Sequence, residues 1–121
     1  MTLNDNSDII GPQCINVWAT QVLEGVSDSQ LPYLEANSAP DSWFKSVDTV
    51  VERILITAGS AECLRDSIEV FAKQICSVHH STTFWLQENG VHNEPYFCKG
   101  MKSRDPTPQI LEWLAMGFKG V

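Results

Sequence analysis

The first third of this chain lacks positive charge. Residues 1–44 contain no lysine or arginine, and the first basic residue is Lys45. Six of the fifteen acidic residues fall in this stretch, which leaves nine acids against all eight bases in the remainder. The formal net charge of −7 therefore belongs mainly to the N-terminal part. Such a surface disfavours nucleic acid and anionic membrane as partners and favours a basic protein or ribonucleoprotein, although the same charge also serves solubility.

Long hydrophobic runs are missing as well. No segment approaches the roughly 20 apolar residues that a transmembrane helix needs. The polar and acidic start of the chain, residues 1–5, has neither the basic nor the apolar region of a secretory signal peptide. We therefore expect a cytoplasmic protein without a membrane partner, in which the four cysteines stay reduced.

The sequence also lacks a nucleotide-binding loop, a recognisable nucleophile motif and a standard metal-binding motif. From this we expect no enzymatic activity and no cofactor. The chain has 121 residues, of which 43% are hydrophobic and 19% charged, as is usual for one globular domain. We expect residues 1–10 to form a flexible arm and residues 11–121 to form a single globular domain.

The periodicity of the apolar residues predicts an α+β fold that is mostly helical, with about four helices. A central antiparallel helical hairpin is expected over residues 42–80, because two stripes at spacings of three and four residues follow each other there. Gly59 is the expected stop of its first helix, and Ser60 is the expected cap of its second. Further amphipathic helices are predicted from Pro12 to about Gly25 and from Thr107 to Phe118.

One β-hairpin is predicted before the last helix. Residues 82–87 are rich in β-branched and aromatic side chains, which favour a strand. Asn89-Gly90 is a strong turn signal, and residues 96–99 are the better candidate for the return strand because Pro95 cannot donate to a ladder. A two-stranded hairpin is marginally stable alone, so it is expected to pack on the helices or to extend a sheet across a homodimer.

Residues 27–41 form a long, proline-bounded stretch that does not suit a long helix or strand. Loops of this length in compact domains are often functional, although Leu31, Tyr33 and Leu34 could simply anchor the loop to the core. We interpret the stretch as a recognition loop, in which acids steer association and Tyr33 supplies buried contact. The expected partner-binding residues are Glu24, Asp28, Tyr33, Glu35 and Asp41.

Together these features predict a small acidic protein that inhibits or sequesters a macromolecule with a basic surface, in the manner of an inhibitor, immunity protein, antitoxin or anti-defence protein. The first alternative is a zinc-binding or homo-oligomeric structural protein. Two cysteines and two histidines in reach of one another could form a tetrahedral zinc site. The candidate ligands are Cys76, His79 or His80, His92 and Cys98.

Other candidate sites are weaker. A nucleophile could be Cys76 beside His79 or His80, or Ser81 beside His80, but no orienting third group is recognisable. The acids Asp48 and Glu52 are four residues apart and are better explained as a solvated helix face. One basic and aromatic cluster could stack a single nucleic-acid strand, although three charges are few on so acidic a chain. Its members are Tyr96, Phe97, Lys99, Lys102 and Arg104.

Overall fold

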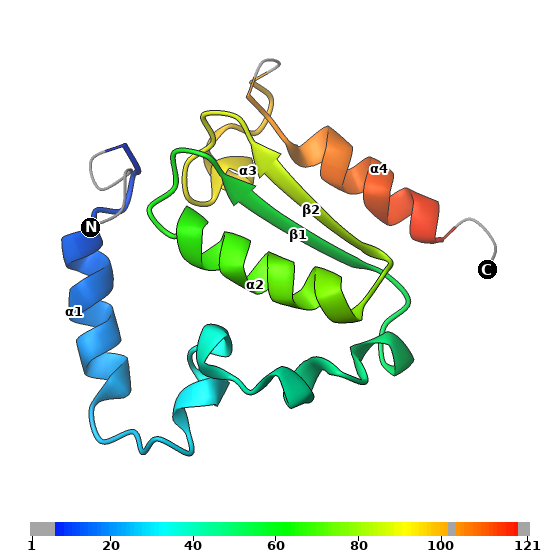
Figure 1. Cartoon of the computed structure of the whole chain (residues 1–121). Coiled ribbons are helices and arrows are strands. Elements are labelled where there is room, and N and C mark those ends of the chain that lie inside the picture. Colours follow the sequence, from blue (N-terminus) through cyan, green and yellow to red (C-terminus); the bar gives the residue numbers. More distant parts are fainter. Residues whose placement is uncertain (1–6, 102–103, 119–121) are drawn as a thin grey trace.

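The computed structural model describes residues 7–101 and 104–118. Figure 1 shows a small sheet with long helices on either side of it and an extended N-terminal part. The α+β class and the predominance of helix over strand confirm the predicted fold class. In chain order the helices and strands are α1 (Pro12–Leu23), β1 (Ile54–Gly59), α2 (Arg65–Val78), β2 (Thr82–Gln87), α3 (Glu94–Phe97) and α4 (Thr107–Gly117).

The two strands are parallel neighbours. Ile54 pairs with Thr82, and the register continues to Gly59 opposite Gln87. Parallel strands need a crossover connection, and α2 supplies it, so β1, α2 and β2 form one βαβ unit. α2 packs on one face of the sheet, and α4 runs alongside β2 (Figure 1). The carboxyl ends of both strands therefore meet at the same edge.

The predicted helical hairpin is wrong in its first half. Residues 54–59 form β1, and the segment before it contains only 3₁₀ turns, η3 (Asp41–Phe44) and η4 (Val47–Thr49). The short apolar run of β1 fits a helical stripe and a buried strand equally well, so its periodicity could not decide between them. Pairing with β2 decides in favour of the strand. α2 begins only at Arg65, so Ser60 lies in the loop after β1 and does not cap the helix.

The predicted antiparallel β-hairpin is also wrong. The strand over residues 82–87 is confirmed, but its partner is β1, in parallel orientation. The expected return strand instead overlaps α3, where Pro95 occupies the first turn and so needs no hydrogen-bond donor. Asn89 does lie in a turn and has a positive φ of 56°, but this turn starts a loop toward α3. The homodimer, which the hairpin edge had suggested, stays a prediction.

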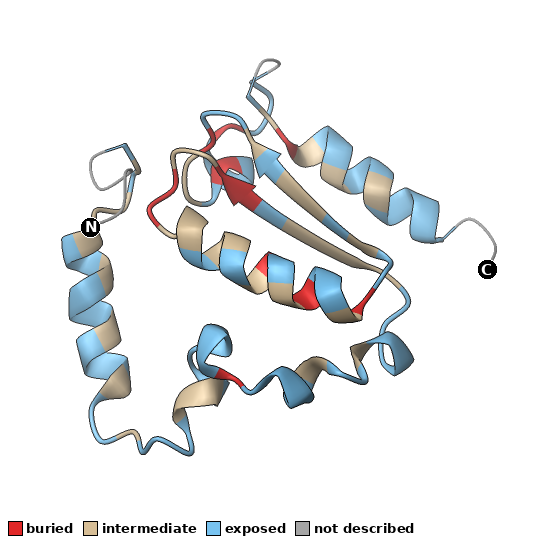
Figure 2. Cartoon of the chain, viewed as in Figure 1, coloured by how far each residue is buried: buried red, intermediate tan, exposed pale blue. Residues whose placement is uncertain are grey.

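The core is small and contains charged groups. Its buried apolar members include Ala58 on β1 and Ala72 and Ile75 on α2. Figure 2 shows buried stretches on both of these elements. Glu62 and Glu94 are also buried, with 6% and 2% of their surface exposed. Buried carboxylates must be hydrogen-bonded, and both of these lie near the carboxyl end of the sheet. This edge therefore becomes the candidate site. No helix in the described ranges has the length and apolar character that crossing a bilayer requires.

Candidate functional site

Two loops meet at the carboxyl end of the parallel strands. Residues 60–64 follow β1, and residues 88–93 follow β2. The backbone N–H of Ala61 donates to the carbonyl oxygen of Gly90 at 2.9 Å, and the N–H of Asn89 donates to Oγ of Ser60 at 2.7 Å. Parallel α/β sheets place ligands and reactive groups outside this end of their strands. Side chains on the two loops are therefore the first to consider for chemistry.

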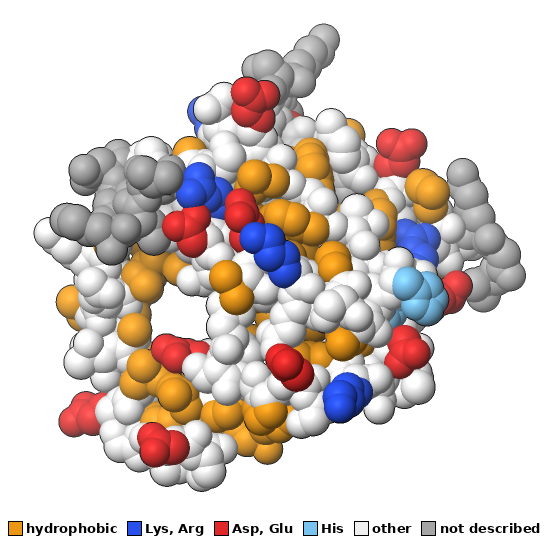
Figure 3. Space-filling view, in the orientation of Figure 1, with side chains coloured by type: hydrophobic (Ala, Val, Ile, Leu, Met, Phe, Trp, Pro, Cys, Tyr) orange, Lys and Arg blue, Asp and Glu red, His pale blue; other side chains and the backbone are white. Residues whose placement is uncertain are grey.

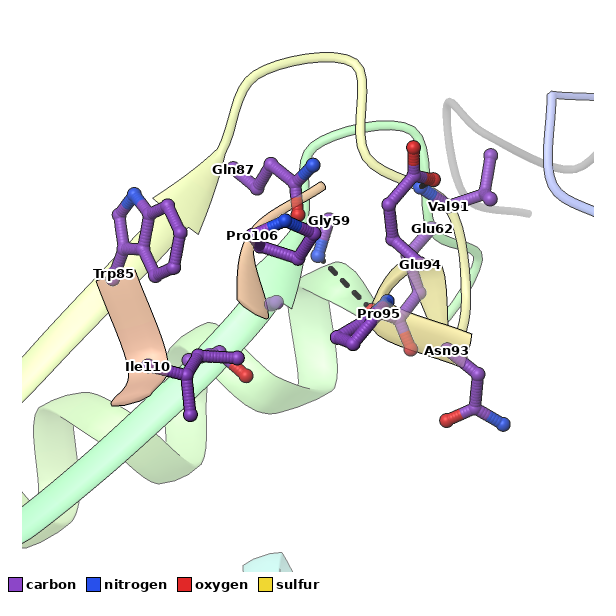
Figure 4. A pocket seen from close by; sticks show the side chains of 12 residues that line it. Gly59, Glu62, Trp85, Gln87, Val91, Asn93, Glu94, Pro95, Pro106 and Ile110 are labelled. Carbon is purple, nitrogen blue, oxygen red and sulfur yellow. Dashed lines mark hydrogen bonds between the residues drawn. The ribbon is translucent and has the colours of Figure 1, made fainter. Parts of the chain in front are cut away.

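Glu62 and His92 form a hydrogen-bonded pair across these loops. Oε1 of Glu62 lies 2.7 Å from Nδ1 of His92, and Oε2 accepts the backbone N–H of Gly59 at 3.1 Å. Figure 4 shows Glu62 at this end of the sheet with its dashed bond to Gly59. An ionised carboxylate only accepts hydrogen bonds, so a bond to ionised Glu62 requires the proton on Nδ1. In the neutral ring this leaves Nε2 as the acceptor.

The imidazole of His92 is less buried than the acid that holds it. The His92 side chain is 24% exposed, whereas that of Glu62 is 7% exposed. Within residues 7–101 and 104–118, Nε2 has no hydrogen-bond partner. The arrangement is a buried acid that holds a partly exposed histidine. Such a histidine can accept a proton from one reactant and return it to another.

A second buried acid fixes the loop that carries His92. Oε2 of Glu94 accepts the N–H of Val91 at 2.9 Å, and Oε1 lies 2.7 Å from the Arg104 guanidinium. The Sγ of Cys98 donates to the same Oε1 at 3.0 Å. Burial raises the pKa of Glu94, but these three partners more than offset it and hold the pKa below its ordinary value. Glu94 is therefore a charged structural anchor of the histidine loop.

Two hollows adjoin the pair. A cavity of about 160 Å³ lies at the carboxyl edge between the strands, α3 and α4, and Glu62 and Glu94 line it (Figure 4). His92 faces a different hollow, an apolar groove of about 320 Å³ between α1 and the start of α2. The groove provides an apolar binding surface beside the histidine. Its lining comprises Ile10, Ile15, Trp18, Ala19, Val22, Leu23, Leu34, Glu35, Leu64 and His92.

No known protein family, curated protein or solved structure shows a significant match to this chain. The site must therefore be interpreted from its own geometry.

The five residues predicted to bind a partner are all exposed. They are distributed along the segment that links α1 to β1, where Figure 3 shows acidic and hydrophobic side chains together at the lower margin of the molecule. The ring centroids of Tyr33 and Trp43 are 4.7 Å apart, so Tyr33 is packed on a neighbour while 76% of its surface stays exposed. Asp41 accepts the side-chain amide of Gln74 at 3.1 Å, which ties this segment to α2. Glu24, Asp28 and Glu35 lie on the same exposed segment.

The proposed zinc ligands are not brought together. His79 ends α2, is 2% exposed, and bonds through Nε2 to the carbonyl oxygen of Val51 at 2.9 Å. His92 lies beyond the opposite end of that helix, beside Glu62. The 14 residues of α2 span about 20 Å, so the two histidines cannot share one metal ion. Among the described residues, no three His, Cys, Asp or Glu side chains are placed to hold a metal.

The remaining candidates stay apart from the Glu62–His92 pair. Cys76, His80 and Ser81 are exposed and lie at the far end of α2. Asp48 and Glu52 belong to the irregular segment before β1, so they do not share a helix face. In the basic cluster, Arg104 binds Glu94, and Lys102 lies outside the described residues.

The sequence reasoning missed Glu62 and the role of His92. Both follow short apolar runs, in Ile-Leu-Ile-Thr-Ala-Gly-Ser-Ala-Glu and in Phe-Trp-Leu-Gln-Glu-Asn-Gly-Val-His. An acid and a histidine, each placed a few residues after a strand of the same parallel sheet, are the signal that could have revealed them. The signal was hidden because residues 54–58 were assigned to a helix.

Proposed function

We propose that this chain carries the acid–histidine pair of a hydrolytic site, with Glu62 as the orienting acid and His92 as the general base. The proposal rests on the 2.7 Å contact between Oε1 of Glu62 and Nδ1 of His92, in which the histidine side chain stays 24% exposed. In Ser-His-Asp triads a buried carboxylate holds the histidine tautomer in the same way and stabilises the imidazolium that forms during reaction.

The placement of the two residues supports this proposal. The acid follows β1, the histidine follows β2, and both stand at the carboxyl end of a parallel sheet. In α/β-hydrolases the acid likewise precedes the histidine in the chain. This likeness to α/β-hydrolases concerns only the order and placement of the two residues. The proposal itself rests on the local geometry of the Glu62–His92 pair.

The reaction we propose is ester hydrolysis. Nε2 of His92 takes the proton of an attacking hydroxyl as its oxygen bonds to the ester carbonyl carbon, and Glu62 stabilises the resulting imidazolium. The imidazolium then returns the proton to the leaving alkoxide as the ester C–O bond breaks. Among the described residues, no serine or cysteine is hydrogen-bonded to Nε2, so the hydroxyl belongs either to water or to a serine that approaches Nε2 on substrate binding. Attack by water releases the carboxylic acid directly. Attack by a serine leaves an acyl-serine, which water then hydrolyses while Nε2 takes the proton of the water and returns it to the serine oxygen.

The groove beside His92 supports an apolar substrate. Trp18, Val22 and Leu64 are among its lining residues, and Glu35 is its single acidic one. An aliphatic or aromatic group would bury apolar surface there, at about 25 cal/mol for each Å² removed from water. A free fatty acid would meet Glu35 as a like charge. We therefore propose neutral esters with an apolar acyl group as the substrate class.

Hydrolysis of p-nitrophenyl hexanoate by the purified chain tests the proposal. We expect His92→Gln to remove the activity and Glu62→Gln to lower it by roughly 10²- to 10⁴-fold, because the tautomer and the imidazolium are no longer supported. His80→Gln is the matched control, since His80 is exposed and distant from Glu62. A rate that His92→Gln leaves unchanged would overturn the proposal. A burst of p-nitrophenol would indicate a serine ester intermediate, and a linear time course would indicate direct attack by water.

We propose the non-catalytic inhibitor as the second candidate, because one observation favours it. The Tyr33–Trp43 ring pair is exposed and has the acids Glu35 and Asp41 near it in the chain. Exposed aromatic anchors within an acidic surround suit binding to a basic protein or ribonucleoprotein. Reversal of Asp28, Glu35 and Asp41 to lysine should slow association with a partner captured from native lysate, and the effect should shrink in high salt. An association rate unchanged at low salt would eliminate this candidate.

A further inference from the structure

One carboxylate links the two loops that carry the proposed acid and base. Asp8 lies just before α1, and its Oδ2 accepts the backbone N–H of Cys63 at 2.9 Å. Its Oδ1 accepts the N–H of His92 at 2.8 Å and that of Ile9 at 2.7 Å. Cys63 directly follows Glu62 in the chain. Asp8 is thus bound to the neighbour of the proposed acid and to the proposed base itself.

We propose that Asp8 is the positioning residue of this site, and that it sets the distance between Glu62 and His92 by bridging their loops. This inference rests on the proposed function, because the Asp8 bridge affects catalysis only if Glu62 and His92 act as a catalytic pair. Asp8 does not touch the reacting atoms. It acts through the backbone of the two loops, so its removal should change the geometry of the pair and leave the groove for substrate in place.

The chemistry of the bridge suits this role. A carboxylate has two oxygens, and here each is committed to a different loop, so one rigid group holds both. Hydrogen bonds from N–H groups to an ionised acceptor are about twice as strong as neutral ones. Burial raises the pKa of Asp8, but the N–H groups of Cys63 and His92 outweigh it and bring the pKa below its ordinary value. Asp8 is therefore ionised at neutral pH, as a double acceptor must be.

The remaining contacts between the loops do not replace this bridge. The Ala61–Gly90 and Ser60–Asn89 hydrogen bonds join the beginning of each loop, next to the strands. Glu62 and His92 lie farther along, where a displacement of about 1 Å between reacting groups can cost on the order of 10²-fold in rate. Asp8 acts at this outer position. Residues 7–10 thus have a structural part in the site, whereas residues 1–6 of the predicted arm lie outside the described residues.

The test compares Asp8→Asn with Asp105→Asn. Asp105 accepts the backbone N–H groups of Gly100 and Thr107 at 2.7 and 2.9 Å, so it makes the same kind of bonds away from the pair. The side-chain amide of the Asp8→Asn variant can accept on one side only, which breaks one of the two links. We expect Asp8→Asn to lower kcat for p-nitrophenyl hexanoate by roughly tenfold or more with KM little changed, and Asp105→Asn to change neither.

A spectroscopic signal separates failure of this inference from failure of the proposed function. The Nδ1–H proton of His92, bonded to Glu62, should appear in the NMR spectrum far downfield, and Asp8→Asn should shift it upfield or remove it. If the chain hydrolyses no ester but this shift occurs, the positioning role stands and the proposed function falls. If His92→Gln removes hydrolysis but Asp8→Asn leaves both the rate and the signal unchanged, the positioning role falls.

A measurement on the unmodified chain covers the case in which Asp8→Asn does not fold. The amides of Cys63 and His92 are held by the same carboxylate, so both should be protected from hydrogen exchange by a similar factor. Rapid exchange of the His92 amide, at the rate of an unstructured peptide, would overturn the bridge.

Discussion

Gly59 and Gly90 touch backbone to backbone at the base of the proposed site. A Cβ placed on Gly59 would overlap the carbonyl group of Gly90, and both residues are buried. Gly59 is the last residue of β1, and Gly90 lies two residues before His92 in the loop that follows β2. This close packing allows the loop after β2 to cross the end of β1 and to bring His92 to Glu62.

Gly59→Ala should therefore damage both stability and the site. The added methyl group meets backbone atoms, which cannot rotate away, so we expect a loss of about 2 kcal/mol or more in the free energy of unfolding, measured by urea denaturation. Gly11→Ala is the control, because a Cβ there has no neighbour within 4 Å, and its effect should stay below about 1 kcal/mol. Equal losses in the two variants would contradict the close approach.

Glu94→Gln should destabilise the chain more than loss of a surface ion pair. Glu94 is 2% exposed and bonds to Val91, Cys98 and Arg104, so an amide in its place leaves a buried group without a suitable partner. We expect a loss of about 1–3 kcal/mol in urea denaturation. Asp66→Asn is the matched control, because Asp66 also pairs with an arginine at 2.6 Å but its side chain is 48% exposed. That control should cost less than about 1 kcal/mol.

Acid should weaken the fold through Asp8 and Glu94. The folded pKa of each lies below the ordinary values of 3.8 and 4.5. A carboxyl with a depressed pKa contributes its stability above the unfolded value and loses it as the pH falls through the folded value. We expect Tm to decline as the pH drops below about 4.5, and the decline to be shallower in Asp8→Asn and in Glu94→Gln. An identical decline in all three proteins would contradict the assigned contacts.

The cysteines should divide into two reactivity classes. Burial and the carboxylates of Asp8 and Glu62 raise the pKa of Cys63 to about 11, and the hydrogen bond to Glu94, with burial, raises that of Cys98. Both stay protonated at pH 8, and both are buried, whereas Cys14 and Cys76 are exposed. Peptide mapping after brief iodoacetamide treatment should find label on the exposed pair only. All four should react after unfolding, and rapid labelling of native Cys63 would contradict its contacts.

Three of the four predicted helices are confirmed, and the fourth, over the first half of the expected hairpin, is wrong. The stripes that predicted α1, the body of α2 and α4 are long enough to define a helical period. β2 was also predicted, because its β-branched and aromatic residues suit a strand. β1 was missed because six residues carry too little periodicity, and its identity depends on pairing with β2 across the whole of α2.

The candidate site depended on that missing strand. Glu62 and His92 are 30 residues apart, and only a parallel sheet places their loops side by side. With residues 54–58 assigned to a helix, Glu62 was missed and His92 was considered only as a metal ligand. Asp8 was invisible for a different reason, since its backbone N–H partners on Cys63 and His92 are 55 and 84 residues away in the sequence. Glu94 binds residues close to it in the chain, but its burial follows only from the packing of the folded molecule.

The direct test of the central claim is the tautomer of His92 in the folded chain, measured by ¹⁵N NMR of its ring at neutral pH. We predict a proton on Nδ1, hydrogen-bonded to Glu62, and an unprotonated Nε2 ready to accept a proton. Glu62→Gln should remove the downfield Nδ1–H signal, while His80→Gln should leave it unchanged. The proposed acid–base pair would be contradicted if wild-type His92 carried its proton on Nε2, or if Glu62→Gln left the Nδ1–H signal unchanged.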